Sequence, residues 1–389
     1  MKILSILGAR PQIIKHAVIE EVINKNYKNK IKNITVHTGQ HYNFNLSNIF
    51  FNQLKLKKPN YHLNISKLKH SEMVGSMIFK LGKILRNENP DVVLLYGDTN
   101  STLAGAVSAS KEKIPIAHVE AGLRSFNLSM PEEINRILTD RVSSLLFCPS
   151  KVSKENLIVE GYNKMKDKNI MYHGDVMYDL HKRFAKKFIK KTNKEEYFLV
   201  TIHREENSNK RILDKIIFNL EFFPKYKKLV WPAHPRINKY LKKKIKSKNI
   251  KILPPQGYLE FGSLIKNSNL VLTDSGGVQK ESFYFDNNCF VLRKETEWLE
   301  LTKKKLNYLI NPEEKNFYKI ILKKKFAKPS TKFKPYGDGK SGVRIINSIY
   351  KFFNLYLFNL LYYNSSVLNR SRNEYFNYRI SRIYWNVCF

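Results

Sequence analysis

Short apolar runs alternate with longer stretches of helical periodicity along most of this chain, and that alternation limits its fold more than any other feature. The runs are rich in Val, Ile and Leu, as expected of strands that are buried on both faces. They lie at residues 3–7, 34–37, 92–95, 116–119, 145–148, 198–202, 228–231, 250–253, 270–273 and 290–292. Strands that alternate with helices predict βαβ units and a parallel sheet with helices on both faces. The sequence therefore predicts an α/β fold.

The number of these runs predicts two domains. So many strands rarely form a single sheet, and 389 residues are too many for one ordinary core. We expect two Rossmann-like, doubly wound domains, the first at residues 1–174 with a last strand at 170–173, and the second at residues 175–340. A closing helix at 341–353 should pack back on the first domain.

Residues 354–389 differ in character from the rest of the chain, because Tyr, Phe and Trp are interleaved there with basic residues. Such a tail could lie on a membrane surface, or it could be an unstructured appendage or a frameshifted terminus. We assign the tail no role. No run in the chain approaches the ~20 apolar residues that a membrane-spanning helix needs, so we expect no integral membrane association.

The net charge of +36 would suit a nucleic-acid partner. However, the lysines that dominate this charge fall on expected helix faces and loops, for example at 186–191 and 242–246, and no nucleic-acid-binding motif accompanies them. A charge run alone is usually a solvated face. We therefore expect no nucleic-acid partner, although the excess charge would concentrate an anionic substrate near the protein.

The N-terminal segment resembles a signal peptide only in part. Its apolar run ends at residues 8–11 in Gly-Ala-Arg-Pro rather than at a small-residue cleavage site, which favours a first strand and a cytoplasmic protein. The cysteines Cys148, Cys289 and Cys388 have no paired spacing, which predicts neither a disulfide framework nor a zinc site. His and carboxylate residues do not occur at metal-ligand spacing on one element, so we expect no catalytic metal.

Charged or glycine-bearing segments follow several of the apolar runs directly. They lie at residues 94–102, 118–125, 130–136, 201–207 and 273–282. Open parallel sheets build their ligand sites at the carboxyl ends of the strands. The pattern therefore predicts an enzyme with an active site in a cleft.

Two carboxylates at strand ends are candidates for acid or base chemistry. Asp98 could be a helix N-cap, but Thr99, Asn100 or Ser101 could cap the helix instead and leave Asp98 free. Glu120 stands among small residues at a strand end, where a carboxylate is expected to be paired or functional. We expect Arg124, four residues further on, to be its partner.

The segment at 131–136 predicts the start of a helix, with Pro at its first position. Glu132 and Arg136 are spaced i and i+4, so they should share one face of this helix, while Glu133 and Asn135 should point elsewhere. Acidic residues in a first turn are also routine partners of the helix dipole.

Basic residues accompany the carboxylates. Arg10 opens a helix after the first strand and Lys15 lies about one turn later, which suits either an anion site or an ordinary strand-to-helix turn. His203, beside Arg204 at a strand end, could be a phosphate ligand, an acid or a base. His234 repeats this pattern one βα unit later.

A glycine-bearing turn in the second half predicts a diphosphate site. Gly276 and Gly277 would expose the amides of a helix N-terminus, Ser275 adds a hydroxyl, and Glu281 lies one turn later, within reach of ribose hydroxyls. The turn is neither a GxGxxG fingerprint nor a P-loop, which argues against nicotinamide cofactors and NTP hydrolysis. A sugar linked to a nucleoside diphosphate fits it better.

Together these segments resemble the non-hydrolysing UDP-N-acetylglucosamine 2-epimerase family, over about residues 1–350. The matching stretches, in order, are Gly8-Ala9-Arg10-Pro11 with Lys15, Thr38-Gly39-Gln40-His41, Gly97-Asp98-Thr99, His118-Val119-Glu120-Ala121-Gly122-Leu123-Arg124, Pro131-Glu132-Glu133-Ile134-Asn135-Arg136, His203-Arg204, Asp274-Ser275-Gly276-Gly277 and Tyr336-Gly337-Asp338-Gly339. The resemblance implies the two-domain GT-B architecture, an active site between the domains and a homodimer.

The resemblance also implies a mechanism and roles. UDP leaves by anti elimination across C1–C2 of the sugar, and it then adds back to the glycal, so no cofactor is needed. Asp98, Glu120 and Glu132 would be the acid/base carboxylates, and His203 would steady the departing diphosphate. Arg10, Lys15, Arg136, Ser275, Gly276, Gly277 and Glu281 would bind the UDP-sugar substrate. Gln40 and His41 match a segment at which some members bind a second UDP-sugar as an activator.

One stretch departs from the family pattern. Residues 293–300 read Arg-Lys-Glu-Thr-Glu-Trp-Leu-Glu, with Trp298 at the position of a family Arg. This departure, with features of residues 8–12 and 96–102, resembles the branch that acts on UDP-2,3-diacetamido-2,3-dideoxy-glucuronate and supplies O-antigen or capsule synthesis. The alternatives are a UDP-sugar glycosyltransferase of the same architecture, a hydrolysing epimerase, and a non-catalytic nucleotide- or nucleic-acid-binding protein.

Overall fold

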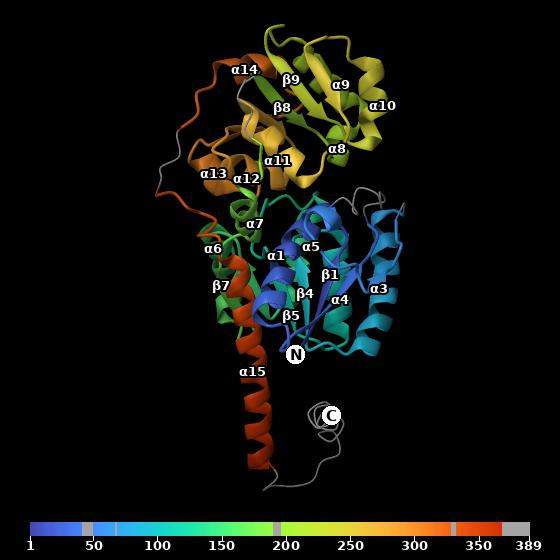
Figure 1. Cartoon of the computed structure of the whole chain (residues 1–389), viewed down its shortest axis with the longest axis vertical. Coiled ribbons are helices and arrows are strands. Elements are labelled where there is room, and N and C mark those ends of the chain that lie inside the picture. The colour runs from blue at the N-terminus through green and yellow to red at the C-terminus, as the bar shows by residue number, and fades with distance from the viewer. Residues whose placement is uncertain (41–49, 67, 190–195, 328–331, 368–389) are drawn as a thin grey trace. The chain divides into compact units, whose positions relative to one another are not determined.

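The computed structural model of the protein describes residues 1–40, 50–66, 68–189, 196–327 and 332–367. The chain divides into two compact units, Met1–Ile346 and Asn347–Phe389. The first unit contains two separate parallel sheets whose strands alternate with helices (Figure 1). This architecture confirms the predicted α/β class with two doubly wound sheets.

The first sheet has seven strands in the described part of the chain, in the order β3-β2-β1-β4-β5-β6-β7, and all of its strand pairs are parallel. The strands are β1 (Lys2–Leu7), β2 (Lys32–His37), β3 (Tyr61–His62), β4 (Val92–Tyr96), β5 (Ile116–Val119), β6 (Leu145–Cys148) and β7 (Asn169–Tyr172). The accompanying helices are α1 (Arg10–Asn26), α3 (His70–Glu88), α4 (Asn100–Lys111), α5 (Pro131–Val142), α6 (Lys151–Val159), the short 3₁₀ helix η1 (Tyr162–Lys164) and α7 (Val176–Phe184).

Helices cover both faces of this sheet. Leu4 and Ile6 of β1 belong to a buried apolar cluster with residues of α3 and α4. On the other face, His16 of α1 contacts the Tyr96 hydroxyl at 2.9 Å, at the end of β4. Because successive residues of a strand point to opposite faces, a continuous apolar run is what a sheet covered on both sides requires.

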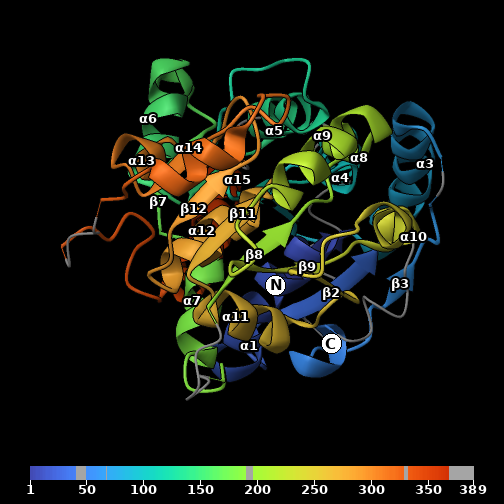
Figure 2. The same ribbon diagram turned by 90° about the horizontal axis from the view of Figure 1, so that it is seen from above.

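The second sheet has six strands in the described residues, in the order β10-β9-β8-β11-β12-β13. The strands are β8 (Tyr197–Thr201), β9 (Lys228–Pro232), β10 (Ile250–Leu253), β11 (Leu270–Thr273), β12 (Cys289–Val291) and β13 (Asn307–Leu309). Figure 2 shows β9, β8, β11 and β12 side by side. The helices are α8 (Glu205–Ser208), α9 (Lys210–Glu221), α10 (Pro235–Lys244), α11 (Tyr258–Asn267), α12 (Gly276–Tyr284), α13 (Leu299–Lys303) and α14 (Phe317–Lys323).

Each sheet has a point at which the order of its strands reverses. The first sheet grows outward in both directions from β1 and β4, and the second from β8 and β11. Loops that leave the carboxyl ends of two such neighbouring strands turn to opposite faces of the sheet, and the crevice between them is the usual ligand site of an open α/β sheet. Asp98, His203 and Ser275 lie in the loops after β4, β8 and β11, and Arg10 is the first residue of the helix that follows β1.

The structure differs from the expected elements at their edges. β3 and β13 were not expected, because a two-residue strand and a three-residue strand leave almost no periodic signal. The helix expected at 341–353 is α15, and it continues to Val367. The expected end was wrong because residues 354–367 contain no Gly or Pro that would stop a helix. Among the described residues, no helix is long and apolar enough to cross a membrane.

Two helical glycines provide a test of the packing between α4 and the first sheet. A Cβ on Gly105 of α4 would lie 2.6 Å from Leu95 Cδ2 and 2.8 Å from Ile6 Cδ1, whereas a Cβ on Gly75 of α3 would meet nothing within 4 Å. We expect Gly75→Ala to raise the free energy of unfolding by about 0.5–1 kcal/mol through helix propensity. Gly105→Ala should lower it by about 1–2 kcal/mol through overpacking.

Urea unfolding of the two variants and the wild type, followed by circular dichroism, measures both effects. A Gly105→Ala variant as stable as Gly75→Ala would contradict close packing between α4 and strands β1 and β4.

Candidate active site

The sequence-predicted carboxylates and cations lie beyond the carboxyl ends of strands in both sheets, either in the connecting loops or in the helices that follow them. Arg10 follows β1, Asp98 follows β4 and Glu120 follows β5, while His203 follows β8 and Ser275 follows β11. Short turns at these strand ends place the charged groups of the first sheet at one edge, and those of the second sheet at the corresponding edge of that sheet.

Glu120 is an ionised carboxylate that forms ion pairs with two lysines. Lys15 Nζ lies 2.5 Å from Glu120 Oε1, and Lys280 Nζ lies 2.8 Å from Oε2. The Glu120 side chain is only 9% exposed. Burial alone would raise its pKa, but Lys15 and Lys280 outweigh burial and lower the pKa to about 2. Gly97 makes room for this contact, since a Cβ there would lie 3.3 Å from Lys15 Nζ and its φ is +62°.

The expected pairing of Glu120 with Arg124 is wrong. Arg124 instead binds Asp140 at 2.7 Å and Glu160 at 2.6 Å. The i, i+4 spacing brings side chains together only on a helix, and residues 120–125 form an irregular turn. In this turn Glu120 has a left-handed φ of 78°, which is uncommon for a residue other than glycine.

Lys280 was not singled out from the sequence. It is fully buried in α12, forms an ion pair with Asp175 in addition to Glu120, and lies 4.0 Å from the ring centroid of Trp298. Asp175 was also missed as a site residue. In a chain with 69 Lys and Arg residues a single lysine carries little signal. The one available clue was its place one turn after the Gly276-Gly277 turn.

Asp98 is held by Arg136. The Arg136 guanidinium forms an ion pair with the Asp98 carboxylate, and Asn135 Nδ2 donates to the Asp98 carbonyl oxygen at 2.9 Å. The adjacent Thr99 is the N-cap of α4, where its hydroxyl accepts from the Thr102 amide. Of the possible caps, Thr99 is therefore the one that forms, and Asp98 does not cap the helix.

The prediction of which α5 side chains lie beside Arg136 was partly wrong. Arg136 binds Glu133 at 2.5 Å rather than Glu132, and Glu133 is fully buried, where it accepts hydrogen bonds from the Ser125 and Phe126 amides. Residues at i and i+3 also neighbour one another on a helix, so Glu133 competes with Glu132 for Arg136. Glu132 stays half-buried. Its charge acts on His203 by raising the pKa of that histidine.

His203 extends from the second sheet with its side chain 44% exposed, and its Nδ1 lies 3.4 Å from the buried Asp274. Desolvation lowers the pKa of His203; Arg204 and Arg10 add to this effect, while Asp274 and Glu132 oppose it. His234, by contrast, caps α10 by accepting from the Arg236 amide at 3.3 Å. Burial lowers the pKa of His234 to about 4.

Arg10 and Glu281 interact electrostatically across the two sheets. Burial lowers the pKa of Arg10, and Glu281 partly offsets this. The guanidinium of Arg10 stacks on Phe50 and Phe261, 4.6 Å and 5.1 Å from the ring centroids. Burial raises the pKa of Glu281 to about 7, although Arg10 and Lys280 oppose the shift.

The glycine-bearing turn opens α12. Ser275 is its N-cap and accepts from the Val278 amide at 3.4 Å. A Cβ on Gly276 would lie 2.3 Å from Glu297 Oε1, so a larger residue there would displace the Glu297 carboxylate, whereas the nearest atom to a Cβ on Gly277 would be 3.8 Å away. Burial would raise the pKa of Glu297, but Arg293, Arg136 and Arg204 lower it to about 2.

The segment expected to bind an activator is described only at its first residue. Gln40 Oε1 accepts from the Ser101 amide at 3.0 Å and from the Ser101 hydroxyl at 2.7 Å. His41 lies outside the described residues, as does Cys388. Within the described ranges, no group of three or more His, Cys, Asp or Glu side chains could hold a metal ion.

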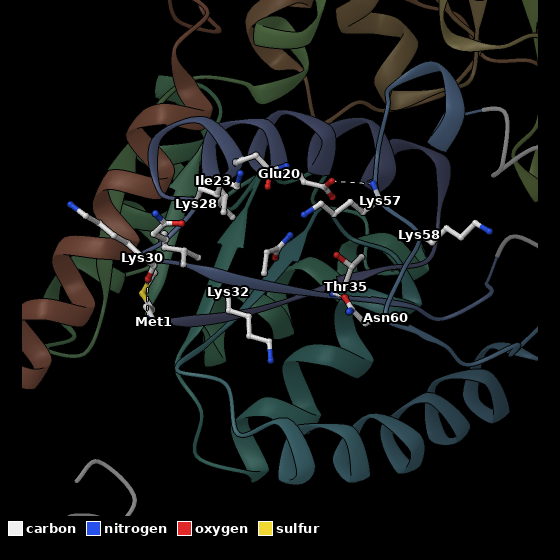
Figure 3. Close-up of a pocket in the computed structure, with 14 residues that line it drawn as sticks. Met1, Glu20, Ile23, Lys28, Lys30, Lys32, Thr35, Lys57, Lys58 and Asn60 are labelled. Carbon is white, nitrogen blue, oxygen red and sulfur yellow. Dashed lines mark hydrogen bonds between the residues drawn. The ribbon is translucent and has the colours of Figure 1, made fainter. Parts of the chain in front are cut away.

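A hollow of about 600 Å³ lies at the opposite end of the first sheet, near the starts of β1 and β2 (Figure 3). Lysines from several segments line it, and Glu20 is also present. None of the sequence-predicted site residues contributes to it. The strand ends that contain the paired charges are therefore the better candidate active site.

Two parallel sheets that place carboxylates, arginines and a glycine-bearing helix N-terminus at their switch points define a two-domain Rossmann-like enzyme suited to an anionic nucleotide. A family model described as UDP-N-acetylglucosamine 2-epimerase matches residues 24–350. The chain belongs to the UDP-N-acetylglucosamine 2-epimerase family, a family of isomerases. This membership confirms the resemblance drawn from the sequence.

Three similar proteins illustrate the relationship. A UDP-N-acetylglucosamine 2-epimerase homolog of Methanococcus maripaludis is 44% identical over 89% of this chain and 98% of its own length. A UDP-2,3-diacetamido-2,3-dideoxy-D-glucuronate 2-epimerase of Pseudomonas aeruginosa is 46% identical over 80% of this chain and 88% of its own length. The crystal structure of the Methanocaldococcus jannaschii UDP-GlcNAc 2-epimerase with UDP-GlcNAc and UDP matches with a TM-score of 0.81 and 42% identity, over 90% of this chain and 100% of that one.

The raised pKa of Glu281 predicts a dependence of stability on pH. The folded protein keeps this carboxyl protonated up to about pH 7, while an unfolded chain loses the proton near 4.5, so stability should fall as the pH rises between these values. Between these pH values the free energy of unfolding of the wild type should fall by up to about 3 kcal/mol, and we expect Glu281→Gln to abolish this fall. Urea unfolding at pH 5 and pH 8 measures it.

The exposed Glu260, changed to Gln, serves as the control and should keep the wild-type dependence on pH. An equally steep fall in Glu281→Gln and wild type would show that Glu281 is not the group responsible.

Proposed function

We propose that the protein catalyses the non-hydrolysing 2-epimerisation of a UDP-2-acetamido sugar to its manno epimer. The observation on which this proposal depends is that Lys15 and Lys280 both bind the Glu120 carboxylate. Glu120 follows β5, and Asp98 follows the neighbouring strand β4. Carboxylates that are held by cations at the same edge of a sheet suit the exchange of a carbon-bound proton. Family membership supplies the reaction type.

The reaction needs two half-steps. In the first, a base takes the C2 proton of the sugar while the C1–O bond breaks, so that UDP leaves with the bond electrons and a glycal forms. In the second, an oxygen of the UDP β-phosphate attacks C1 and an acid returns a proton to the opposite face of C2. The hydrogen moves as a proton and no oxidation occurs, so the chemistry requires no redox cofactor.

Asp98, Glu120 and Glu132 would exchange the C2 proton between them. Glu120 is kept ionised by its two lysines, and Asp98 is held in place by its ion pair with Arg136. Arg136 is thereby committed to Asp98 and Glu133, which gives it a positioning role beside substrate binding. We propose that Glu132, half-buried and electrostatically linked to His203, lies nearest to the departing diphosphate.

The diphosphate would bind at the N-terminus of α12, through the backbone amides of Gly276 and Gly277. His203 and Arg10 would stabilise the charge that builds up on the leaving UDP. Glu281 would accept hydrogen bonds from the ribose hydroxyls. Lys15, which contacts Glu120, would lie beside the sugar. Gln40 and His41 would bind a second UDP-sugar.

Within the family, we propose that UDP-2,3-diacetamido-2,3-dideoxy-glucuronate is a better substrate than UDP-N-acetylglucosamine. The identities to the two kinds of relative are similar, so the stretch at 293–300 carries the distinction. Trp298 is buried there, against the side chain of Lys280. Arg204, half-buried in the same region, offers a positive charge for a uronate carboxylate.

We further propose a cytoplasmic homodimer whose product feeds the synthesis of a surface polysaccharide, an O-antigen or a capsule. A nucleotide-sugar pool inside the cell is where such an enzyme would find its substrate. The excess positive charge would draw this anionic substrate toward the protein.

Proton NMR in D2O tests the reaction directly. UDP-N-acetylglucosamine and UDP-2,3-diacetamido-glucuronate are incubated with the enzyme in separate tubes, and we expect deuterium at C2 with a manno product, faster in the second tube. Release of free sugar and UDP would indicate a hydrolysing epimerase. No exchange in either tube, from folded protein, would favour a transferase.

Substitution of the carboxylates tests their roles. Asp98→Asn, Glu120→Gln and Glu132→Gln should each lower kcat by about 100-fold or more, because each removes a group that moves a proton or fixes one that does. UDP affinity, measured by calorimetry, should stay near the wild-type value. The exposed Glu155, changed to Gln, is the matched control and should retain full activity. Wild-type activity in all three variants would refute the assigned mechanism.

A further inference from the structure

The ammonium group of Lys280 is a fully buried cation that joins three separate parts of the chain. Its Nζ lies 2.8 Å from Glu120 Oε2 and forms a second ion pair with Asp175. The Trp298 ring covers it, with its centroid 4.0 Å from Nζ. Glu120 follows β5 in the first sheet, Asp175 precedes α7, and Lys280 lies in α12 beside the second sheet.

Asp175 fixes where this ammonium group can sit. Its Oδ1 accepts from the Met177 amide at 2.8 Å as the N-cap of α7, and its Oδ2 accepts from the Tyr284 hydroxyl at 3.0 Å as well as from Lys280. Both carboxylate oxygens are therefore occupied, and the side chain is only 2% exposed. A buried anion with so many partners has little freedom to move.

The same helix carries the proposed diphosphate site. Lys280 lies four residues after Gly276 and three after Gly277, so it is on the same face of α12, one turn further on. A ligand at the amides in the first turn of α12 would contact a rigid helix. In the next turn of this helix, Lys280 binds Glu120. The diphosphate site and the carboxylate are thus connected through a single helical turn.

We propose that Lys280 is a positioning residue that aims the Glu120 carboxylate and couples its position to occupation of the diphosphate site at the start of α12. This inference rests on the proposed function, since it assigns Glu120 to proton transfer and α12 to UDP. Lys280 does not itself touch the reacting atoms. It acts through Glu120.

The charges around Glu120 set the direction of the expected effect. Lys15 of α1 and Lys280 of α12 face it directly, and Asp175, Tyr284 and Tyr336 lie near enough to interact electrostatically. Without Lys280, burial and the charge of Asp175 would still raise the pKa of Glu120, and only Lys15 would lower it. The pKa of Glu120 should therefore rise in a variant that lacks this ammonium group.

Lys280→Met tests the inference, because methionine can keep the packing against Trp298 without the charge. We expect kcat to fall by about 10- to 100-fold with little change in KM, since a misplaced reacting group costs rate rather than binding. The lower pH limit of kcat should move up by about one unit or more. The nearby Gln279, also fully buried in α12, bonds Thr296 instead of Glu120. Gln279→Met should lose stability but keep the wild-type pH limit.

A second readout does not depend on turnover. The carboxyl carbon of Glu120, labelled with ¹³C and assigned by its absence in Glu120→Gln, can be titrated by NMR in the wild type and in Lys280→Met. Its pKa should be higher in the variant. Addition of UDP should shift this resonance in the wild type and much less in Lys280→Met, because the coupling through α12 is broken.

Asp175→Asn extends the test should Lys280→Met fail to fold. Asparagine caps a helix as well as aspartate does, but it removes the negative charge that competes for Lys280. The pKa of Glu120 should then fall, opposite to the effect of Lys280→Met.

An unchanged Glu120 titration in both variants, or the same shift in Gln279→Met, would overturn the role of Lys280. If the wild type showed the predicted titration and UDP response but no exchange at C2 of either sugar, the proposed function alone would fail.

Discussion

The contact between the two sheets at the candidate active site depends on one requirement, namely that a buried cation must have anionic partners. Lys280 has no exposure to solvent, and both of its carboxylate partners come from outside the second sheet. An unpaired ammonium group in that position would be strongly destabilising. Helix α12 can therefore bury its lysine only while the turn after β5 and the start of α7 stay in place. The Glu120 carboxylate gains its position from the same contact.

A second set of buried charges supports that turn from the first sheet. Asp140 accepts from Arg124 at 2.7 Å and from the Gly122 amide at 3.1 Å, and its other oxygen contacts His118, whose second nitrogen contacts the Gly97 carbonyl oxygen at 2.7 Å. Gly122 is required here, since a Cβ would lie 2.2 Å from the Ser153 carbonyl oxygen. This network offsets the strain of the left-handed φ at Glu120, a cost of about 1–3 kcal/mol. Strain held by surrounding structure is typical of functional sites.

The sequence predicted the long elements well and the contacts between them poorly. The parallel strands followed from apolar runs, and charged residues at the ends of strands β4, β5, β8 and β11 indicated the candidate site. Arg124 was assigned to Glu120 by a helical spacing that has no meaning in an irregular turn. Glu133 was wrongly expected to point away from Arg136, because the spacing to Arg136 allows two neighbours on the same helix, and only packing against the Ser125 amide selects between them.

The sequence by itself determined the α/β class, the two sheets and the set of candidate carboxylates, because hydrophobic periodicity and strand-end chemistry are local properties of the chain. Tertiary structure decided which cation neutralises which carboxylate. Lys280 and Glu120 are separated by 160 residues, and no local pattern connects them. They pair because desolvation makes an isolated buried charge so costly that the fold must bring opposite charges together, wherever they lie in the sequence.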